Sequence, residues 1–260
     1  MPYFLDKPLS PYYIAKMTWR EIEAHIKAAP VIILPVGVNE PCTEFGALGA
    51  AGITCWAMAN TLSEKKSILL APMVTYGYSS AFKAFSGCAA VSPKTMTAYV
   101  FDIMRSWVGQ GIKTIITIDN SIANADAVIE AAKRLRCQYP SAHCQVLNWQ
   151  RMSDIRTFIA QQLHGSEYGM SQFGLLSLAA YLDKSYVRLA AARGSEPLAA
   201  TVKEFERWKK TGADPEKFRK LFPDCRTSDI AGCFSIEFGE KLFCRIMEQF
   251  ETALTKELPQ

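Results

Sequence analysis

Val31-Ile-Ile-Leu-Pro-Val-Gly37 is the stretch of sequence that decides the fold. Its apolar residues follow one another without polar alternation, which is typical of a parallel strand covered on both faces. Similar runs come later in the chain, at Ser67-Ile-Leu-Leu-Ala-Pro72, Lys113-Thr-Ile-Ile-Thr-Ile-Asp119 and Val146-Leu-Asn-Trp149. Together they predict a mostly parallel β-sheet.

Helical patterns alternate with these runs. Thr18 and Glu21 have the spacing of a capping box, which predicts a helix that begins there and ends near Pro30. Further helices are predicted over residues 93–110 and 124–136. The alternation of strand and helix is that of an α/β protein.

The composition is that of an ordinary globular protein, with 49% hydrophobic and 21% charged residues in a chain of 260. No internal repeat or low-complexity linker divides it, so residues 1–260 are predicted to form a single domain, although residues 183–229 are charged and irregular in pattern. The net charge of +4 is spread along the chain and calls for neither nucleic acid nor a membrane surface as a partner.

The eight cysteines form no CxxC pair, and the chain opens without a secretory apolar region. No apolar run approaches the roughly 18 residues of a membrane-spanning helix. We therefore expect a soluble, cytoplasmic protein with reduced thiols.

A functional site is expected at the carboxyl ends of the strands, in the loops that begin near Gly37, Met73, Asp119 and Trp149. These loops contain the segments Val36-Gly-Val-Asn-Glu-Pro-Cys-Thr-Glu-Phe45, Tyr76-Gly-Tyr-Ser-Ser-Ala-Phe-Lys-Ala-Phe-Ser-Gly-Cys-Ala-Ala-Val-Ser-Pro-Lys-Thr95 and Asp119-Asn-Ser-Ile-Ala-Asn124. In these motifs the sequence resembles the creatininase (creatinine amidohydrolase) family. The family pattern V-G-S-T-E-Q-H-G-P-H is matched by the segment from Val36, and Y-G-x-S-x-E-H-x-x-F-P-G-T-x-S-L-S-P-E-T is matched more closely by the segment from Tyr76. The third family motif, N-G-H-G-G-N, falls on residues 119–124 and keeps only its final Asn.

The resemblance implies a three-layer α/β/α fold with a mostly parallel sheet, a homo-oligomer that is commonly a hexamer, and hydrolysis of an amide by water activated between two divalent ions. Glu40 keeps the identity of a family metal ligand. Other ligand positions hold residues that do not bind such ions well: Cys42, Ala51, Ser121 and Ala123. One carboxylate cannot hold two ions, so neither a metal nor another cofactor is predicted.

The chain contains three histidines. His25 falls in the first predicted helix and His143 in a loop before a strand, where surface positions are expected. His164 opens the segment His164-Gly-Ser-Glu-Tyr-Gly-Met-Ser171, which resembles the family's H-A-G-x-x-E-T-S, with Glu167 two positions early. His164 is therefore either beside the substrate or a plain surface or core residue.

The predicted catalytic residues are Glu40, Cys42, His164 and Glu167. The Cys42 thiol would act as a nucleophile if the His164 imidazole lay near it. Alternatively, Cys42 is a small buried residue that fills the space of a lost ligand. A small-molecule ligand would contact polar and aromatic side chains, although the aromatic ones could equally belong to the core or to a subunit contact: Tyr76, Tyr78, Phe82, Asp119, Ser121 and Trp149.

These features leave three hypotheses. The first is an amidohydrolase-like protein that acts on or binds a small amide or cyclic carbon–nitrogen compound without the usual metals. The second is an inactive pseudoenzyme that serves as a binding or assembly partner. The third is recruitment of a single ion by Cys42, Glu44 and Asp119, an unusual set because it lacks imidazole.

Overall fold

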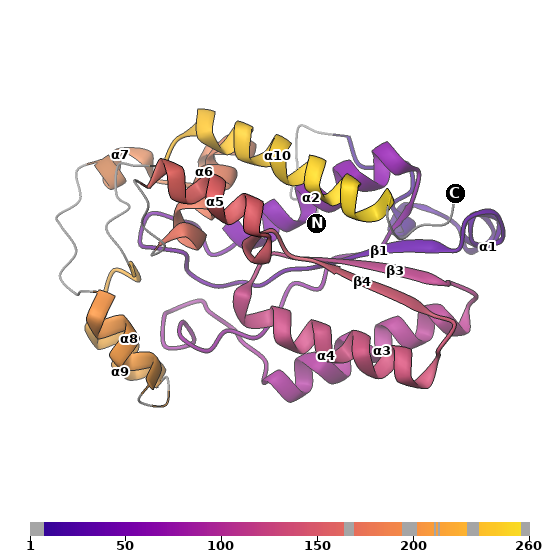
Figure 1. Ribbon diagram of the computed structural model, residues 1–260, viewed down its shortest axis with the longest axis horizontal. Helices are drawn as coiled ribbons and strands as arrows, with labels where there is room; N and C mark the ends of the chain where they lie inside the picture. Colours follow the sequence, from indigo (N-terminus) through magenta and orange to yellow (C-terminus); the bar gives the residue numbers. More distant parts are fainter. Residues whose placement is uncertain are drawn as a thin grey trace.

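A four-stranded parallel sheet forms the centre of the protein in the computed structural model (Figure 1). The structure describes residues 8–163, 169–193, 202–210, 212, 214–227 and 234–255. The strand order is β2-β1-β3-β4. The strands are β1 (Val31–Val36), β2 (Leu69–Leu70), β3 (Thr114–Asp119) and β4 (His143–Leu147). The parallel sheet predicted from the apolar runs is thus confirmed.

The last strand differs from its prediction. It starts at His143, which pairs with Thr114, and ends at Leu147, while Trp149 opens the short helix η2 (Trp149–Arg151). The prediction that His143 lies in a loop before the strand was therefore wrong. Cys144 and Gln145 continue the pairing with β3. The strand therefore begins where this pairing begins, and not where the apolar run of the sequence begins.

One face of the sheet is covered by α3 (Pro93–Gly109) and α4 (Ile122–Gln138), as Figure 1 shows. Near the start of the chain, the 3-10 helix η1 (Ile14–Lys16) precedes α1 (Trp19–Ala28). The predicted capping box is present in α1, since the Thr18 hydroxyl accepts from the Glu21 N–H while the Glu21 carboxylate accepts from the Thr18 N–H. The helix predicted over residues 124–136 is two residues longer at each end.

The opposite face is covered by α2 (Ala50–Lys66), α5 (Ser153–Gln162), α6 (Met170–Leu182) and α10 (Ile236–Thr255). Helix α2 was not predicted, because it is buried nearly all round and so has no apolar stripe to mark it. The two helical layers and the sheet give the expected three-layer arrangement.

The stretch expected to be irregular contains helices instead. It holds η3 (Lys184–Tyr186), α7 (Leu189–Arg193), α8 (Val202–Lys210) and α9 (Pro215–Leu221). In Figure 1, α8 and α9 lie together at one end of the molecule, beyond the ends of the strands. Packing between aromatic side chains stabilises this pair of helices. The charge pattern of the segment gives no sign of that packing.

No helix in the described part of the chain is long and apolar enough to cross a membrane. Within the same residues, the cysteines are free thiols.

Candidate functional site

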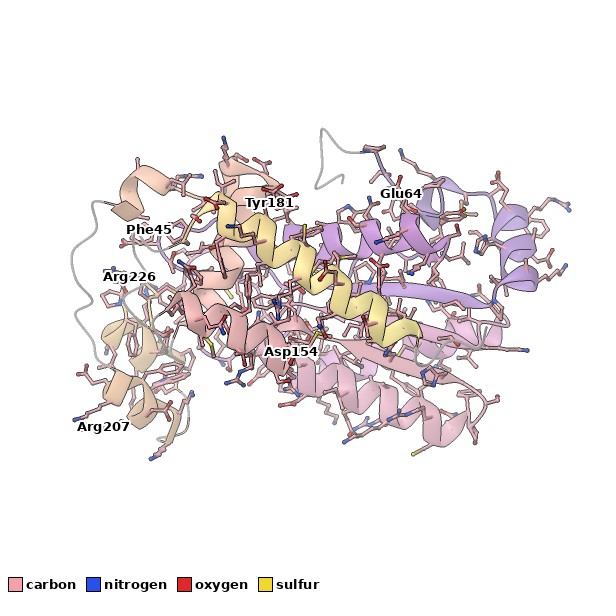
Figure 2. All side chains as sticks on the ribbon, turned by 45° about the horizontal axis from the view of Figure 1, so that its top comes forward. Phe45, Glu64, Asp154, Tyr181, Arg207 and Arg226 are labelled. Carbon is pink, nitrogen blue, oxygen red and sulfur yellow. The ribbon has the colours of Figure 1, made fainter. Side chains whose placement is uncertain are left out.

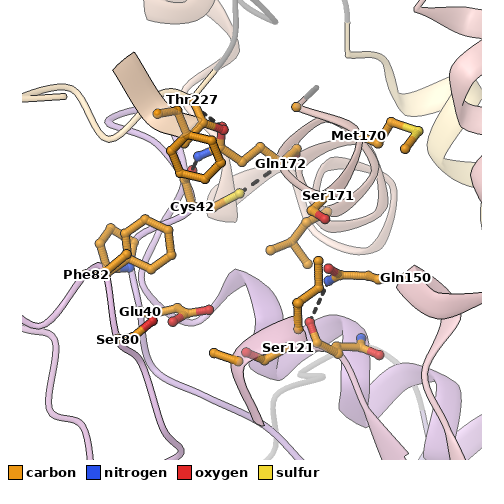
Figure 3. Close-up of a pocket in the computed structure, with 18 of the residues that line it drawn as sticks. Glu40, Cys42, Ser80, Phe82, Ser121, Gln150, Met170, Ser171, Gln172 and Thr227 are labelled. Atoms are coloured by element: carbon orange, nitrogen blue, oxygen red, sulfur yellow. Dashed lines mark hydrogen bonds between the residues drawn. The ribbon is translucent and has the colours of Figure 1, made fainter. Parts of the chain in front are cut away.

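A cavity of about 650 Å³ opens at the carboxyl ends of the strands, where the sequence predicts a site (Figure 3). The loops after β1, β3 and β4 form its floor, α5 and α6 form one wall, and α8 lies over it. This volume lies within the range of small-molecule sites. The topology brings these segments together because parallel strands all end at the same edge of the sheet.

Glu40 carries the main polar group of the floor. Figure 3 shows its carboxyl group pointing into the cavity. Its Oε2 atom is buried and has no hydrogen-bond partner within the described ranges. Burial raises the pKa of the Glu40 carboxyl to about 7, an effect that the hydroxyls of Ser79 and Ser121 partly offset. A buried polar atom without a partner is costly, so this oxygen is ready to bond to a ligand.

Asp119 lies behind the floor and does not line the cavity. Its carboxyl oxygens accept hydrogen bonds from the backbone N–H of Ser121 at 3.1 Å and from the side-chain amide of Asn148 at 3.0 Å. Burial raises the pKa of Asp119 to about 7, against the lowering effect of these bonds. The predicted contact of Asp119 with a ligand therefore has no support in this geometry.

Ser121 and Gln150 complete the polar floor. Ser121 caps α4, since its hydroxyl accepts from the Asn124 N–H. The side-chain amide of Gln150 donates to the Asn120 carbonyl at 2.7 Å. Figure 3 places Gln150 across the cavity from Glu40. Sequence reasoning placed Ser121 at this site but missed Gln150, which directly follows a predicted strand-end tryptophan.

Asn124, the residue kept from the third motif, holds two strand-end loops together. Its amide nitrogen donates to the Gly37 carbonyl at 3.1 Å, and its oxygen accepts from the Tyr78 N–H at 2.6 Å. A side chain at Gly77 would collide with this amide. Asn124 therefore fixes the loops that carry Glu40 and the second motif.

Cys42 is buried, and its thiol donates to the backbone carbonyl of Gln172 at 3.8 Å. Burial, with the charge of Glu40 as a smaller cause, raises the pKa of the Cys42 thiol far above its usual value. A thiol in this state is a poor nucleophile. The geometry supports the alternative in which Cys42 fills space at the cavity wall.

The predicted aromatic contacts divide into two groups. Phe82 and Trp149 line the cavity, whereas Tyr76 and Tyr78 do not, and Tyr76 is 57% exposed. Two aromatic residues of α8 that were not predicted, Phe205 and Trp208, also line it. No sequence pattern identifies them as site residues, because site residues were expected in the loops after the strands. Phe205 and Trp208 lie in a helix more than 50 residues after the last strand.

His164 and Glu167, two of the predicted catalytic residues, lie outside the described residues. Gly169 to Gln172, which follow them, line the cavity.

A pair of divalent ions at this cavity needs several carboxylate or imidazole ligands. In the part of the chain that the structure describes, no group of three or more His, Cys, Asp and Glu side chains is placed to hold a metal ion. Both oxygens of Asp119 are already hydrogen-bonded, and the Cys42 thiol stays protonated. Glu44, the third member of the suggested single-ion set, is exposed.

Comparisons with known proteins agree on a single family. The family model for creatininase, described as creatinine amidohydrolase, matches residues 15–254. The creatinine amidohydrolase of Pseudomonas putida is 26% identical over 124 residues, which are 45% of this chain and 48% of that protein. This match thus spans about half the length of the curated relative.

Solved structures share the fold. A tryptophan-to-phenylalanine mutant of creatininase superposes with a TM-score of 0.81 at 20% identity, covering 96% of this chain and 100% of that one. A crystal structure of creatinine amidohydrolase gives 0.76 at 19% identity, covering 96% and 98%. A putative creatinine amidohydrolase from Bacteroides fragilis gives 0.62 at 18% identity, covering 85% and 87%.

Proposed function

The chain belongs to the creatininase family, and on that premise we propose that its cavity binds a small amide or cyclic carbon–nitrogen compound through Glu40. The family's solved members include a glutamate-to-glutamine mutant of creatininase complexed with creatine. In this chain the binding energy comes from the protein's own side chains, without a dinuclear metal centre.

The observation that carries the proposal is the unpartnered Oε2 atom of Glu40 at the cavity floor. Among the described neighbours, nothing satisfies this atom. An amide offers an N–H that donates to a carboxylate and a carbonyl that accepts from a carboxylic acid. With a pKa of about 7, Glu40 is present in both forms near neutral pH, so either half of an amide can satisfy it.

The polar groups around Glu40 suit the same ligand. The Ser121 hydroxyl and the Gln150 amide lie on the floor and can bond to the remaining edges of a planar amide. A hydrolytic role would require Glu40 to take a proton from water and return it to the leaving nitrogen. The two residues proposed to assist, His164 and Glu167, precede the wall segment at Gly169.

A second candidate is a pseudoenzyme that binds its ligand without turnover. The state of the Cys42 and Asp119 side chains favours it. The position of Cys42 holds a protonated thiol, and both oxygens of Asp119 are occupied. Assembly into a homo-oligomer remains a prediction from the resemblance, and either candidate accommodates it.

Titration calorimetry with creatinine and hydantoin tests the proposal. We expect binding to the wild type, loss of at least about tenfold in affinity for Glu40→Ala, and no change for the exposed control Glu44→Ala. Absence of binding, or equal binding to Glu40→Ala, would refute the proposed function. Product formation followed by NMR then separates the hydrolase from the pseudoenzyme.

A further inference from the structure

We propose that the natural ligand of this cavity carries an aromatic ring, which contacts the part of the cavity lined by α8, the first helix of the pair α8 and α9 that is called the α8–α9 hairpin. This inference rests on the proposed function and names the class of its ligand as an aryl-substituted amide or cyclic amide. The cavity lining contains aromatic side chains from α8 and from the second motif loop, and these carry the inference.

The strand-end loops, called the floor, supply polar groups together with Phe82 and Trp149, whereas α8, called the roof, supplies two aromatic side chains beside the charged pair Glu206 and Lys209. Glu40, Ser121 and Gln150 supply hydrogen-bonding groups from the strand-end loops, and α8 lines the same cavity with the side chains of Phe205 and Trp208. A five-membered cyclic amide offers polar groups to the floor but no aromatic ring to the side chains of Phe205 and Trp208. A cavity of about 650 Å³ has room for both parts of a larger ligand.

The roof is a packed structure and not a loose flap. The rings of Phe205 and Trp208 are stacked, 5.8 Å apart and 18° from parallel, and Trp208 meets Phe218 edge-on at 4.8 Å. The Trp208 indole N–H donates to the Asp214 carbonyl at 2.7 Å. The one polar atom of Trp208 is therefore used inside the hairpin, and a ligand meets its apolar ring surface.

The hairpin is fastened to the body at the second motif loop. Phe82 meets Phe218 edge-on at 5.5 Å, and the Arg219 guanidinium donates to the Ala84 carbonyl at 2.6 Å. Phe82 itself lines the cavity. An aromatic surface therefore continues from the wall at Phe82 to the roof, and it is held in place before a ligand binds.

The two charged side chains of the roof, Glu206 and Lys209, also line the cavity and are paired with each other. Lys209 lies over the Phe205 ring at 4.6 Å and pairs with Glu206 at 3.1 Å. In Figure 2, Arg207 marks the outer side of the hairpin, where its side chain is exposed. Rings gain from stacked and edge-on contacts with other rings, so an aryl group is the best match for this surface.

Titration calorimetry with hydantoin and 5-phenylhydantoin tests the inference on the full chain. Both compounds carry the same hydantoin ring for Glu40, and only the second carries an aryl group for the α8 side chains. We expect the phenyl compound to bind about tenfold or more tightly to the wild type, because it buries an additional ring. The preference should fall to less than about threefold in Phe205→Ala.

Phe85 provides the matched control. It belongs to the same aromatic cluster, 6.2 Å from Phe218, but it does not line the cavity. Phe85→Ala should therefore keep the full preference for the phenyl compound. Circular dichroism verifies the fold of each variant, and Phe205→Leu, which removes the ring face but keeps an apolar side chain, replaces Phe205→Ala if the latter does not fold.

The outcomes separate this inference from the proposed function. Equal affinity of the wild type for both compounds would overturn the aromatic ligand and leave the proposed function standing. A preference that survives in both Phe205 variants would overturn the role of the hairpin. Failure of both compounds to bind would count against the proposed function itself and, with it, against this inference.

Discussion

Thr227 donates two hydrogen bonds to the side-chain oxygen of Gln172, one from its backbone N–H and one from its hydroxyl, each 3.0 Å long. The amide nitrogen of Gln172 donates in turn to the carbonyls of Cys42 and Cys225. A carboxamide has two donor hydrogens and two acceptor sites, and here all four are used. Gln172 thus joins α6, the Glu40 loop and the segment that follows the hairpin.

This arrangement predicts that Gln172→Ala destabilises the protein by about 3 kcal/mol, because it leaves several buried backbone groups without partners. The free energy of unfolding, measured in urea, checks it. Gln161→Ala, at an exposed position of α5, should change stability by less than about 0.5 kcal/mol. Equal effects of the two substitutions would show that Gln172 has no joining role.

Asp119 predicts a pH dependence of stability. Its pKa is raised from 3.8 to about 7 in the folded protein, so folding takes up a proton between these values. The contribution of Asp119 is fully present below pH 3.8 and is lost as pH rises through 7. Between pH 5 and pH 8 the wild type should lose on the order of 2 kcal/mol through this residue.

The comparison of Asp119→Asn with Asp154→Asn isolates this contribution. The carboxamide introduced by Asp119→Asn does not ionise, so the stability of this variant should fall less between pH 5 and pH 8, whatever the cost of the substitution at pH 5. The control at exposed Asp154 should keep the wild-type slope. A wild type whose stability is constant or rises over this range would contradict the raised pKa.

Cys42 is predicted to resist thiol reagents. Its burial and raised pKa keep it protonated, whereas Cys137 and Cys244 are exposed. With a mild alkylating reagent at pH 7.5, followed by peptide mass mapping, we expect Cys42 to react at least about a hundredfold more slowly than Cys137. Rapid labelling of Cys42 would instead restore the thiolate nucleophile.

Metal removal should leave the protein unchanged. The proposed function needs no metal, so purified protein should contain far less than one equivalent of zinc or manganese per chain, measured by elemental analysis. Dialysis against a chelator should change neither Tm nor hydantoin affinity. Two equivalents of tightly bound metal would contradict the proposed metal-free site.

Gly239 in α10 predicts a large effect of a single methyl group. A Cβ at this position would overlap the carbonyl of Ser177 in α6, so the two helices approach as closely as only glycine permits. Gly239→Ala should cost roughly 3 kcal/mol in the free energy of unfolding. Gly109→Ala, at the end of α3 where a Cβ meets nothing within 4 Å, should be neutral or stabilising by up to about 1 kcal/mol.

The sequence by itself determined the sheet and the edge at which the site lies. Strands covered on both faces are rich in β-branched and apolar residues without regular alternation, so Val31–Val36 and Thr114–Asp119 were recognisable without any partner. The same logic placed Glu40 and Ser121 at strand ends. Helix α2 escaped detection for a related reason, since a helix buried nearly all round has no polar face to reveal its period.

Only the tertiary structure decided what surrounds these residues. Gln172 bonds to Cys42 across 130 residues of chain, and the α8–α9 hairpin reaches the cavity through contacts between aromatic rings. Such contacts leave no periodic pattern in the local sequence, because they depend on how the side chains fit together in the folded protein. The unpartnered oxygen of Glu40 and the burial that raises its pKa likewise exist only once the chain has closed around them.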